Sequence, residues 1–113
     1  MRTDCLRLLD AIEQIDLISR FSERGREAFF NDLLVQSAIL HRLALFGEAC
    51  RGMSADLRKA HPEVPWAQII AFRNIIVHEY FGIDLELAWA IVEEHIDSLG
   101  VQLKIILASL PGY

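Results

Sequence analysis

Apolar side chains recur at intervals of three and four residues along most of the chain, which is the period of an amphipathic helix. One seam steps through residues 32–51 and extends just beyond them, at Ile39, Leu43, Phe46, Cys50 and Met53. A longer one crosses residues 84–109 and extends one position further, at Ala88, Val92, Ile96, Leu99, Leu103, Ile106 and Leu110. No hairpin turn signal separates Val- or Ile-rich runs. The pattern therefore predicts an all-α fold.

Two further segments show the helical period. Residues 3–20 carry a wide apolar stripe of Cys5, Leu8, Leu9, Ile12, Ile15 and Ile18. Residues 65–79 carry Trp66, Ile69, Ile70, Phe72, Ile76 and Val77. The stretch between the first two helices, residues 21–30, is rich in charge, and we interpret it as a connector that contains one short helical turn.

Residues that favour helix ends fall between these segments. They are Asn31 or Asp32, Ser54 and Asp84 as N-caps, Gly52 and Gly82 as stops, and Pro65 at a first helical position. Ser54 begins a short helix that must end before Pro62, because proline disfavours helical geometry in the residue ahead of it. We predict one domain over residues 1–113, an antiparallel bundle of four to five helices.

The composition predicts an interface. Residues of the apolar class make up 53% of a chain of 113 residues, more than one small core of this size can hide. We expect a substantial contact with a second copy or with a partner protein.

The charge is acidic and unevenly spread. The net charge is −5, and residues 79–113 hold six acids against Lys104 alone. This balance argues against indiscriminate nucleic-acid binding, so a contact with RNA needs a local basic patch. The densest cationic cluster along the chain is Arg20, Arg24 and Arg26. It is either part of a solvated connector or a patch that contacts a nucleic-acid backbone.

Several classes of site find no support. Charges interrupt every apolar run before the ~20 residues that span a bilayer, and the N-terminus has no signal-peptide pattern, so we expect a cytoplasmic protein without a membrane partner. Cys5 and Cys50 lack metal or redox spacing, which favours free buried thiols. The spacing of the histidines and the lack of a Gly-rich phosphate loop predict no metal and no cofactor. Trp66 and Trp89 are interpreted as packing anchors.

The chemistry gathers in residues 73–80, where Arg73, Asn74, His78 and Tyr80 fall within eight positions. At ~100° per residue, a continuing helix would place Tyr80 about 20° from Arg73 and His78 about 40° from Asn74. Such a helix presents the four groups over a wide arc, which a second copy facing it would tighten.

These residue types suit metal-free RNA cleavage. That reaction needs one group to deprotonate the 2′-hydroxyl, another to protonate the leaving 5′-oxygen, and a cation for the charge on phosphorus. Histidine transfers protons near neutrality, and arginine binds phosphate oxygens through a planar fork. A lone Arg and His on one helix are nevertheless more often structural.

Arg73-x4-His78-x-Tyr80, followed by Phe81-Gly82-Ile83-Asp84, resembles the signature of the HEPN superfamily. More closely, it resembles the HepT-type toxins of HepT–MntA toxin–antitoxin pairs. Supporting matches are Phe46-Gly47-Glu48-Ala49, the His61–Trp66 stretch, and Phe72-Arg73-Asn74. The resemblance covers nearly the whole chain in order.

The resemblance implies a homodimeric, metal-independent endoribonuclease that acts as the toxin of a type VII-like toxin–antitoxin system. Carried over by position, Arg73 and His78 are the catalytic pair and Asn74 supports them. Tyr80 is then the residue to which an MntA-like minimal nucleotidyltransferase, the antitoxin, attaches AMP. Glu48 either hydrogen-bonds into this site or is an ordinary exposed or Arg-paired residue.

Two other functions stay open. The chain is alternatively a non-catalytic helical subunit of a two-component nucleotidyltransferase, which fits the acidic charge. A purely structural helical dimer is the third reading, and it leaves Arg73, Asn74, His78 and Tyr80 unexplained as a set.

Overall fold

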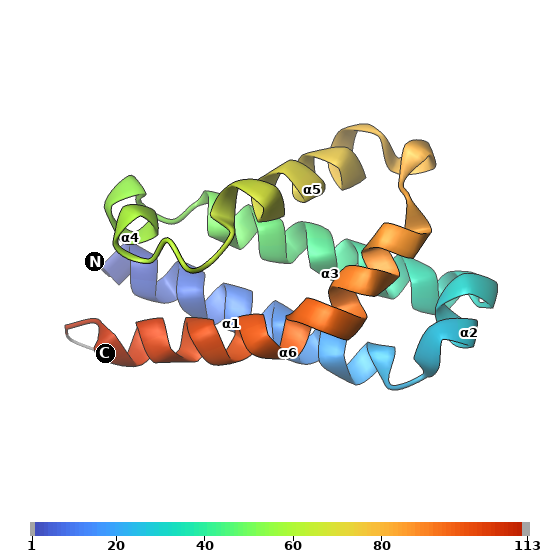
Figure 1. The fold of residues 1–113 in the computed structure, drawn as a ribbon, viewed down its shortest axis with the longest axis horizontal. Coiled ribbons are helices and arrows are strands. Elements are labelled where there is room, and N and C mark those ends of the chain that lie inside the picture. Colours follow the sequence, from blue (N-terminus) through green and yellow to red (C-terminus); the bar gives the residue numbers. More distant parts are fainter. Residues whose placement is uncertain (1, 112–113) are drawn as a thin grey trace.

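The computed structural model describes residues 2–111, and helices make up most of this range (Figure 1). The helices are α1 (Arg2–Ser22), α2 (Gly25–Asn31), α3 (Leu33–Arg51), α4 (Ala55–Ala60), α5 (Trp66–His78), the 3-10 turn η1 (Tyr80–Gly82) and α6 (Leu85–Ser109). The described range contains no strand. The predicted all-α class is confirmed.

Three of the predicted N-cap residues stand at helix starts, and the side chain of each accepts a hydrogen bond from an amide of the first turn. Asp32 Oδ1 accepts a hydrogen bond from the Leu34 amide at 2.9 Å, and Ser54 Oγ accepts one from the Leu57 amide at 3.1 Å. Asp84 Oδ1 accepts one from the Leu87 amide at 3.2 Å. Each bond satisfies an amide that the helix itself leaves unpaired. The starts of α3, α4 and α6 are therefore set by local sequence.

The core lies where α1, α3 and α6 run side by side along the long axis (Figure 1). Every residue of the predicted α3 seam is buried, as is the α6 seam from Ala88 to Ile106. The predicted apolar stripe of the first helix was wrong at Leu9, which is 41% exposed. The buried face of α1 centres on Leu8, Ala11 and Ile15, and Leu9 lies beyond the edge of that face.

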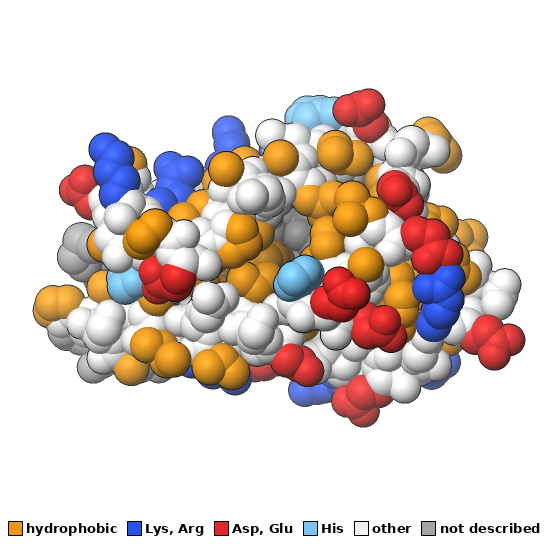
Figure 2. All heavy atoms as spheres, viewed as in Figure 1, with side chains coloured by type: hydrophobic (Ala, Val, Ile, Leu, Met, Phe, Trp, Pro, Cys, Tyr) orange, Lys and Arg blue, Asp and Glu red, His pale blue; other side chains and the backbone are white. Residues whose placement is uncertain are grey.

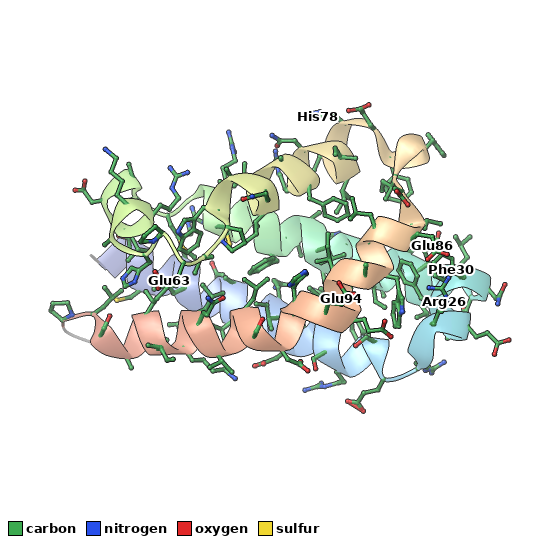
Figure 3. The ribbon with its side chains drawn as sticks, in the orientation of Figure 1. Arg26, Phe30, Glu63, His78, Glu86 and Glu94 are labelled. Carbon is green, nitrogen blue, oxygen red and sulfur yellow. The ribbon has the colours of Figure 1, made fainter. Side chains whose placement is uncertain are left out.

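The predicted connector contains a seven-residue helix, α2, that belongs to the core. Phe29 is fully buried, with its ring centroid 5.3 Å from that of Trp89 on α6. Arg26 pairs with Glu86 and lies over the ring of Phe30, at the contact between α2 and α6 (Figure 3). The charged residues thus cover the outside of α2, while its aromatic residues pack inward.

Helix α3 is the one helix in the described range that is long and apolar enough to cross a membrane by length and composition alone. Its apolar seam packs against α1 in the core instead. Cys50 lies within this seam, and burial raises the pKa of its thiol to about 12. Both Cys5 and Cys50 are free, as predicted, though Cys5 is only partly buried.

Helix α5 packs on α3 at a glycine. A β-carbon built on Gly47 would lie 2.3 Å from Cβ of Arg73 and 3.4 Å from the carbonyl oxygen of Ile69. No real side chain fits in that space, so only glycine lets the two helices approach this closely. The position of Arg73 relative to α3 is fixed by this contact.

Replacing Gly47 with alanine should therefore push α5 away from α3. We expect Gly47→Ala to lower the free energy of unfolding by about 1–3 kcal/mol, as overpacking does, measured by urea denaturation at one protein concentration. The control is Gly82→Ala, where a β-carbon meets no atom within 4 Å and the change should stay within about 0.5 kcal/mol. Equal stability of the two variants would contradict the close approach.

Candidate functional site

Arg73 is the most enclosed of the candidate residues, with a side chain that is 17% exposed. Its Nη2 lies 2.5 Å from Oε2 of Glu48 on α3, and its Nη1 donates a hydrogen bond of 2.8 Å to Oδ1 of Asn74. Its Nε is buried and has no hydrogen-bond partner in the described range. The guanidinium is thus held from two sides, by a carboxylate on one helix and an amide on its own.

Glu48 bridges two cations. Its Oε2 pairs with Arg73, while its Oε1 accepts a hydrogen bond of 3.2 Å from Nη1 of Arg51. Glu48 is therefore paired with arginine, which was one of the two alternatives for this residue. One of its two partners is the candidate residue Arg73. Because the carboxylate is 44% exposed, solvent screens both pairs, and their main effect is on geometry.

His78 is the last residue of α5 and is exposed. Its side chain points away from the bundle (Figure 3), and it takes part in none of the hydrogen bonds or ion pairs found among residues 2–111. It stands five positions after Arg73 on the helix, which is about 7.5 Å along the axis and about 140° around it. The imidazole is therefore free to meet a ligand but does not lie beside Arg73 within one copy.

Tyr80 does not continue the helix, which corrects the expectation that one helix presents all four groups. Helix α5 ends at His78, because Glu79 has a φ of −135° and a ψ of 45°. Tyr80 begins the 3-10 turn η1, with its ring 43% exposed and its edge against Phe81. Arg73, Asn74 and His78 thus share α5, whereas Tyr80 lies on the turn that follows.

An apolar groove of about 510 Å³ opens beside this site, between α3, α5 and α6 (Figure 2). Its walls include Phe46 on α3, Ile69 and Phe72 on α5, and Ile91 and Leu99 on α6. Phe72 is the immediate neighbour of Arg73 in the chain. The sequence pattern did not reveal this groove, because residues that line an open groove follow the same period as residues that fill a core.

The described range contains no group of three or more His, Cys, Asp or Glu side chains that could hold a metal ion. His41 and His95 are exposed, and His61 lies 3.4 Å from Glu63. Trp66 and Trp89 are buried, as predicted for packing anchors. The chemistry that the arrangement offers is proton transfer by His78 and anion binding by Arg73.

The chain is similar to known proteins over most of its length. Residues 11–106 match the family model described as Ribonuclease HepT-like. A probable ribonuclease HepT of Thermococcus cleftensis is 38% identical over 96 residues, which cover 81% of this chain and 84% of that protein. A putative RNase of Methanocaldococcus jannaschii is 34% identical over 100 residues, which cover 88% and 92%. The chain has no match among solved structures.

The matched region contains α3 and α5, and with them Glu48, Arg73, Asn74, His78 and Tyr80. The match covers far more than half of the chain, and two relatives exceed 30% identity over most of both chains. The chain therefore belongs to the HepT-like ribonuclease family of the HEPN superfamily.

Proposed function

We propose that this protein is a metal-independent endoribonuclease whose composite site is built from Arg73 and His78 of two copies. The observation that carries the proposal is the pairing of Arg73 with Glu48 and Asn74, which holds a guanidinium in place on the helix that ends at an exposed His78. Relatives of the chain are named as ribonucleases. A fixed cation and free imidazoles, one as base and one as acid, are the kinds of group that the reaction needs.

The proposed reaction begins when an imidazole takes the proton of the 2′-hydroxyl, and the 2′-oxygen then bonds to phosphorus. The bond from phosphorus to the 5′-oxygen breaks, and a second imidazole donates a proton to that leaving oxygen. The products are a 2′,3′-cyclic phosphate and a 5′-hydroxyl. Arg73 stabilises the negative charge that develops on the phosphoryl oxygens. The His78 residues of the two copies share the roles of base and acid.

A homodimer is part of the proposal, because one copy points Arg73 and His78 in different directions. The surface around the site suits such a contact: Val77, Phe81 and Leu87 are exposed apolar side chains, and the groove beside Phe72 is apolar. Exposed apolar surface of this kind marks protein interfaces. A two-fold contact near α5 would bring the two copies of His78 to one cleft.

We further propose that the protein is the cytoplasmic toxin of a type VII-like pair and that its antitoxin, an MntA-like nucleotidyltransferase, attaches AMP to Tyr80. The exposure of Tyr80 and the fully exposed Phe81 beside it support access by a partner enzyme. AMP groups would add bulk and negative charge next to His78, where RNA phosphates must arrive.

A non-catalytic subunit of a nucleotidyltransferase complex is the second candidate. The net charge of −5 favours it, since RNA repels an acidic surface. It predicts a stable complex with the nucleotidyltransferase, together with no RNA cleavage and no toxicity.

The exposed histidines permit a matched test of catalysis. The wild-type protein should cleave RNA in the presence of EDTA and arrest growth when it is expressed alone. His78→Ala should lose at least about 100-fold in cleavage rate, as the loss of a general acid or base does, and should be harmless to cells.

The control is His41→Ala, a change at an exposed histidine on α3, which should cut RNA at the wild-type rate. Cleavage by His78→Ala at that same rate, with its mass and fold unchanged, would reject the assigned role. A harmless wild-type protein that cuts no RNA would favour the second candidate.

Modification of Tyr80 is tested by intact mass after co-expression with an MntA-like nucleotidyltransferase. The wild-type protein should gain one or more AMP units, and Tyr80→Phe should gain none. Tyr113, the other tyrosine of the chain, supplies the control, because Tyr113→Phe should be modified like the wild type. An unmodified wild-type protein, or AMP retained on Tyr80→Phe, would refute the assignment.

The composite site predicts that activity depends on dimer formation. The native mass should be twice that of the chain, and cleavage per protein molecule should fall on dilution to concentrations where the dimer dissociates. A monomer that keeps full activity per molecule at every dilution would show that one copy suffices.

A further inference from the structure

A group of cations gathers at the α4 end of this acidic protein. We define the basic end as Arg7 on α1, Arg51 on α3, and Arg58 and Lys59 on α4. With Arg73, these are five of the eleven Lys and Arg residues of the chain. In Figure 2, Lys and Arg side chains gather over the α4 end, whereas Asp and Glu side chains dominate the opposite half of that face.

Three helices bring these cations to the C-terminal end of α3. A β-carbon on Gly52 would lie 2.8 Å from Nε of Arg7, so the Arg7 side chain crosses α3 directly after Arg51. The positive charge of Arg58 partly offsets the burial that raises the pKa of Cys50. Both of these cations therefore lie close to residues 50–52, beside Arg51.

The acids at this end offset part of that charge, and they include Asp56, which is exposed on α4 just before Arg58 and Lys59. Asp4 is buried and accepts hydrogen bonds from the amide and the hydroxyl of Ser54, at 2.8 and 2.7 Å. Glu48 is shared between Arg51 and Arg73. Arg7, Arg58 and Lys59 take part in none of the ion pairs found among residues 2–111.

The opposite end of the bundle differs. Arg26 is neutralised by Glu86 near the start of α6. Arg20 and Arg24 border a hollow lined by Leu34, Val35 and Ala38, and the chain places Glu23 and Glu27 beside them. The cluster that looked densest along the sequence therefore has acids close to it in the chain and borders an apolar hollow.

The basic end connects directly to the candidate site. Arg51 touches Glu48 at 3.2 Å, and Glu48 touches Arg73 at 2.5 Å, so the two guanidiniums flank one carboxylate. Helices α3 and α5 run antiparallel, which places Arg51 toward α4 and His78 toward the other end (Figure 1). Cations thus follow one line along the molecule from α4 to Arg73, and His78 lies beyond them.

We propose that the basic end binds the backbone phosphates of the RNA strand that flank the cleaved bond. This inference rests on the ribonuclease function proposed above and adds to it the surface that holds the substrate. Phosphate contacts by Lys and Arg position a nucleic acid without reading its sequence. Such contacts also explain how a protein with a net charge of −5 can bind RNA at all, because a local patch governs the encounter.

The test compares two double variants that remove the same charge from opposite ends. Arg7→Gln with Lys59→Gln alters two exposed cations of the basic end, and Arg20→Gln with Arg24→Gln alters two exposed cations of the other end. Arg51 and Arg58 stay intact, since Arg51 contacts Glu48 and Nε of Arg58 is buried. All variants also carry His78→Ala, so that a labelled single-stranded RNA remains whole during anisotropy titrations.

Removing two phosphate contacts should weaken RNA binding by roughly 20-fold at about 0.1 M salt. The negative slope of log K against log salt should become shallower by about 1.4. The control pair should change the affinity by less than about twofold. Lys59→Gln alone should cost about fivefold, which keeps the test open if the double variant fails to fold.

Equal losses in the two double variants, or a larger loss in the control pair, would overturn the inference. Unchanged RNA affinity with lost binding to the nucleotidyltransferase would also overturn it and assign the basic end to the protein partner. These outcomes are compatible with RNA cleavage by the wild-type protein. A failure of the proposed function looks different, because neither wild-type cleavage nor RNA binding by His78→Ala would then be observed.

Discussion

The contact between Gly47 on α3 and Arg73 on α5 decides where the candidate chemistry can lie. Since no side chain stands at Gly47, the backbone of α5 comes close enough for Arg73 to reach Glu48 and for its guanidinium to be largely enclosed. A looser contact would let Arg73 extend into solvent, and its direction would then vary. The glycine, the carboxylate and the arginine therefore act as one unit, although they come from two helices.

Glu48 and Arg73 also lie at the edge of the basic end, in a chain that is acidic elsewhere. The chain is acidic as a whole, and residues 79–113 hold a single cation. Glu48 nevertheless stands between Arg51 and Arg73, where the basic end meets the candidate site. The acidic balance weighed against a ribonuclease at first, but the fold separates the charges in space. The net charge therefore does not by itself exclude RNA as a ligand.

Much of the fold follows from local sequence, because helix starts depend on interactions within one turn. Asp32, Ser54 and Asp84 cap their helices as predicted, since each side chain bonds an amide two or three positions on. The length of helix α2 was underestimated because seven residues give too few turns to show a period, and the charged residues obscured the buried Phe29. Tyr80 was wrongly placed on the same helix as Arg73. Helix α5 ends because the backbone turns at Glu79, and that position carries no glycine or proline that would predict the end.

The candidate site was only partly accessible to sequence reasoning. Arg73, Asn74 and His78 share one helix, as their spacing predicts, although it also places His78 about 140° around the helix from Arg73. Glu48 and Arg73 are 25 positions apart in the chain, and their pairing depends on the register between α3 and α5. No local rule predicts that register. The basic end could not be predicted for the same reason, because Arg7 and Lys59 come from distant segments of the chain.

The identity of the RNA ends that the wild-type protein produces tests the central claim most directly. Attack by the 2′-hydroxyl, with His78 moving the protons and Arg73 stabilising the charge, predicts 2′,3′-cyclic phosphate and 5′-hydroxyl ends in the presence of EDTA. A strand with one 2′-deoxynucleotide at the cleaved position should stay intact there. Fragments with 5′-phosphate ends that form only when a divalent metal is added would contradict the account.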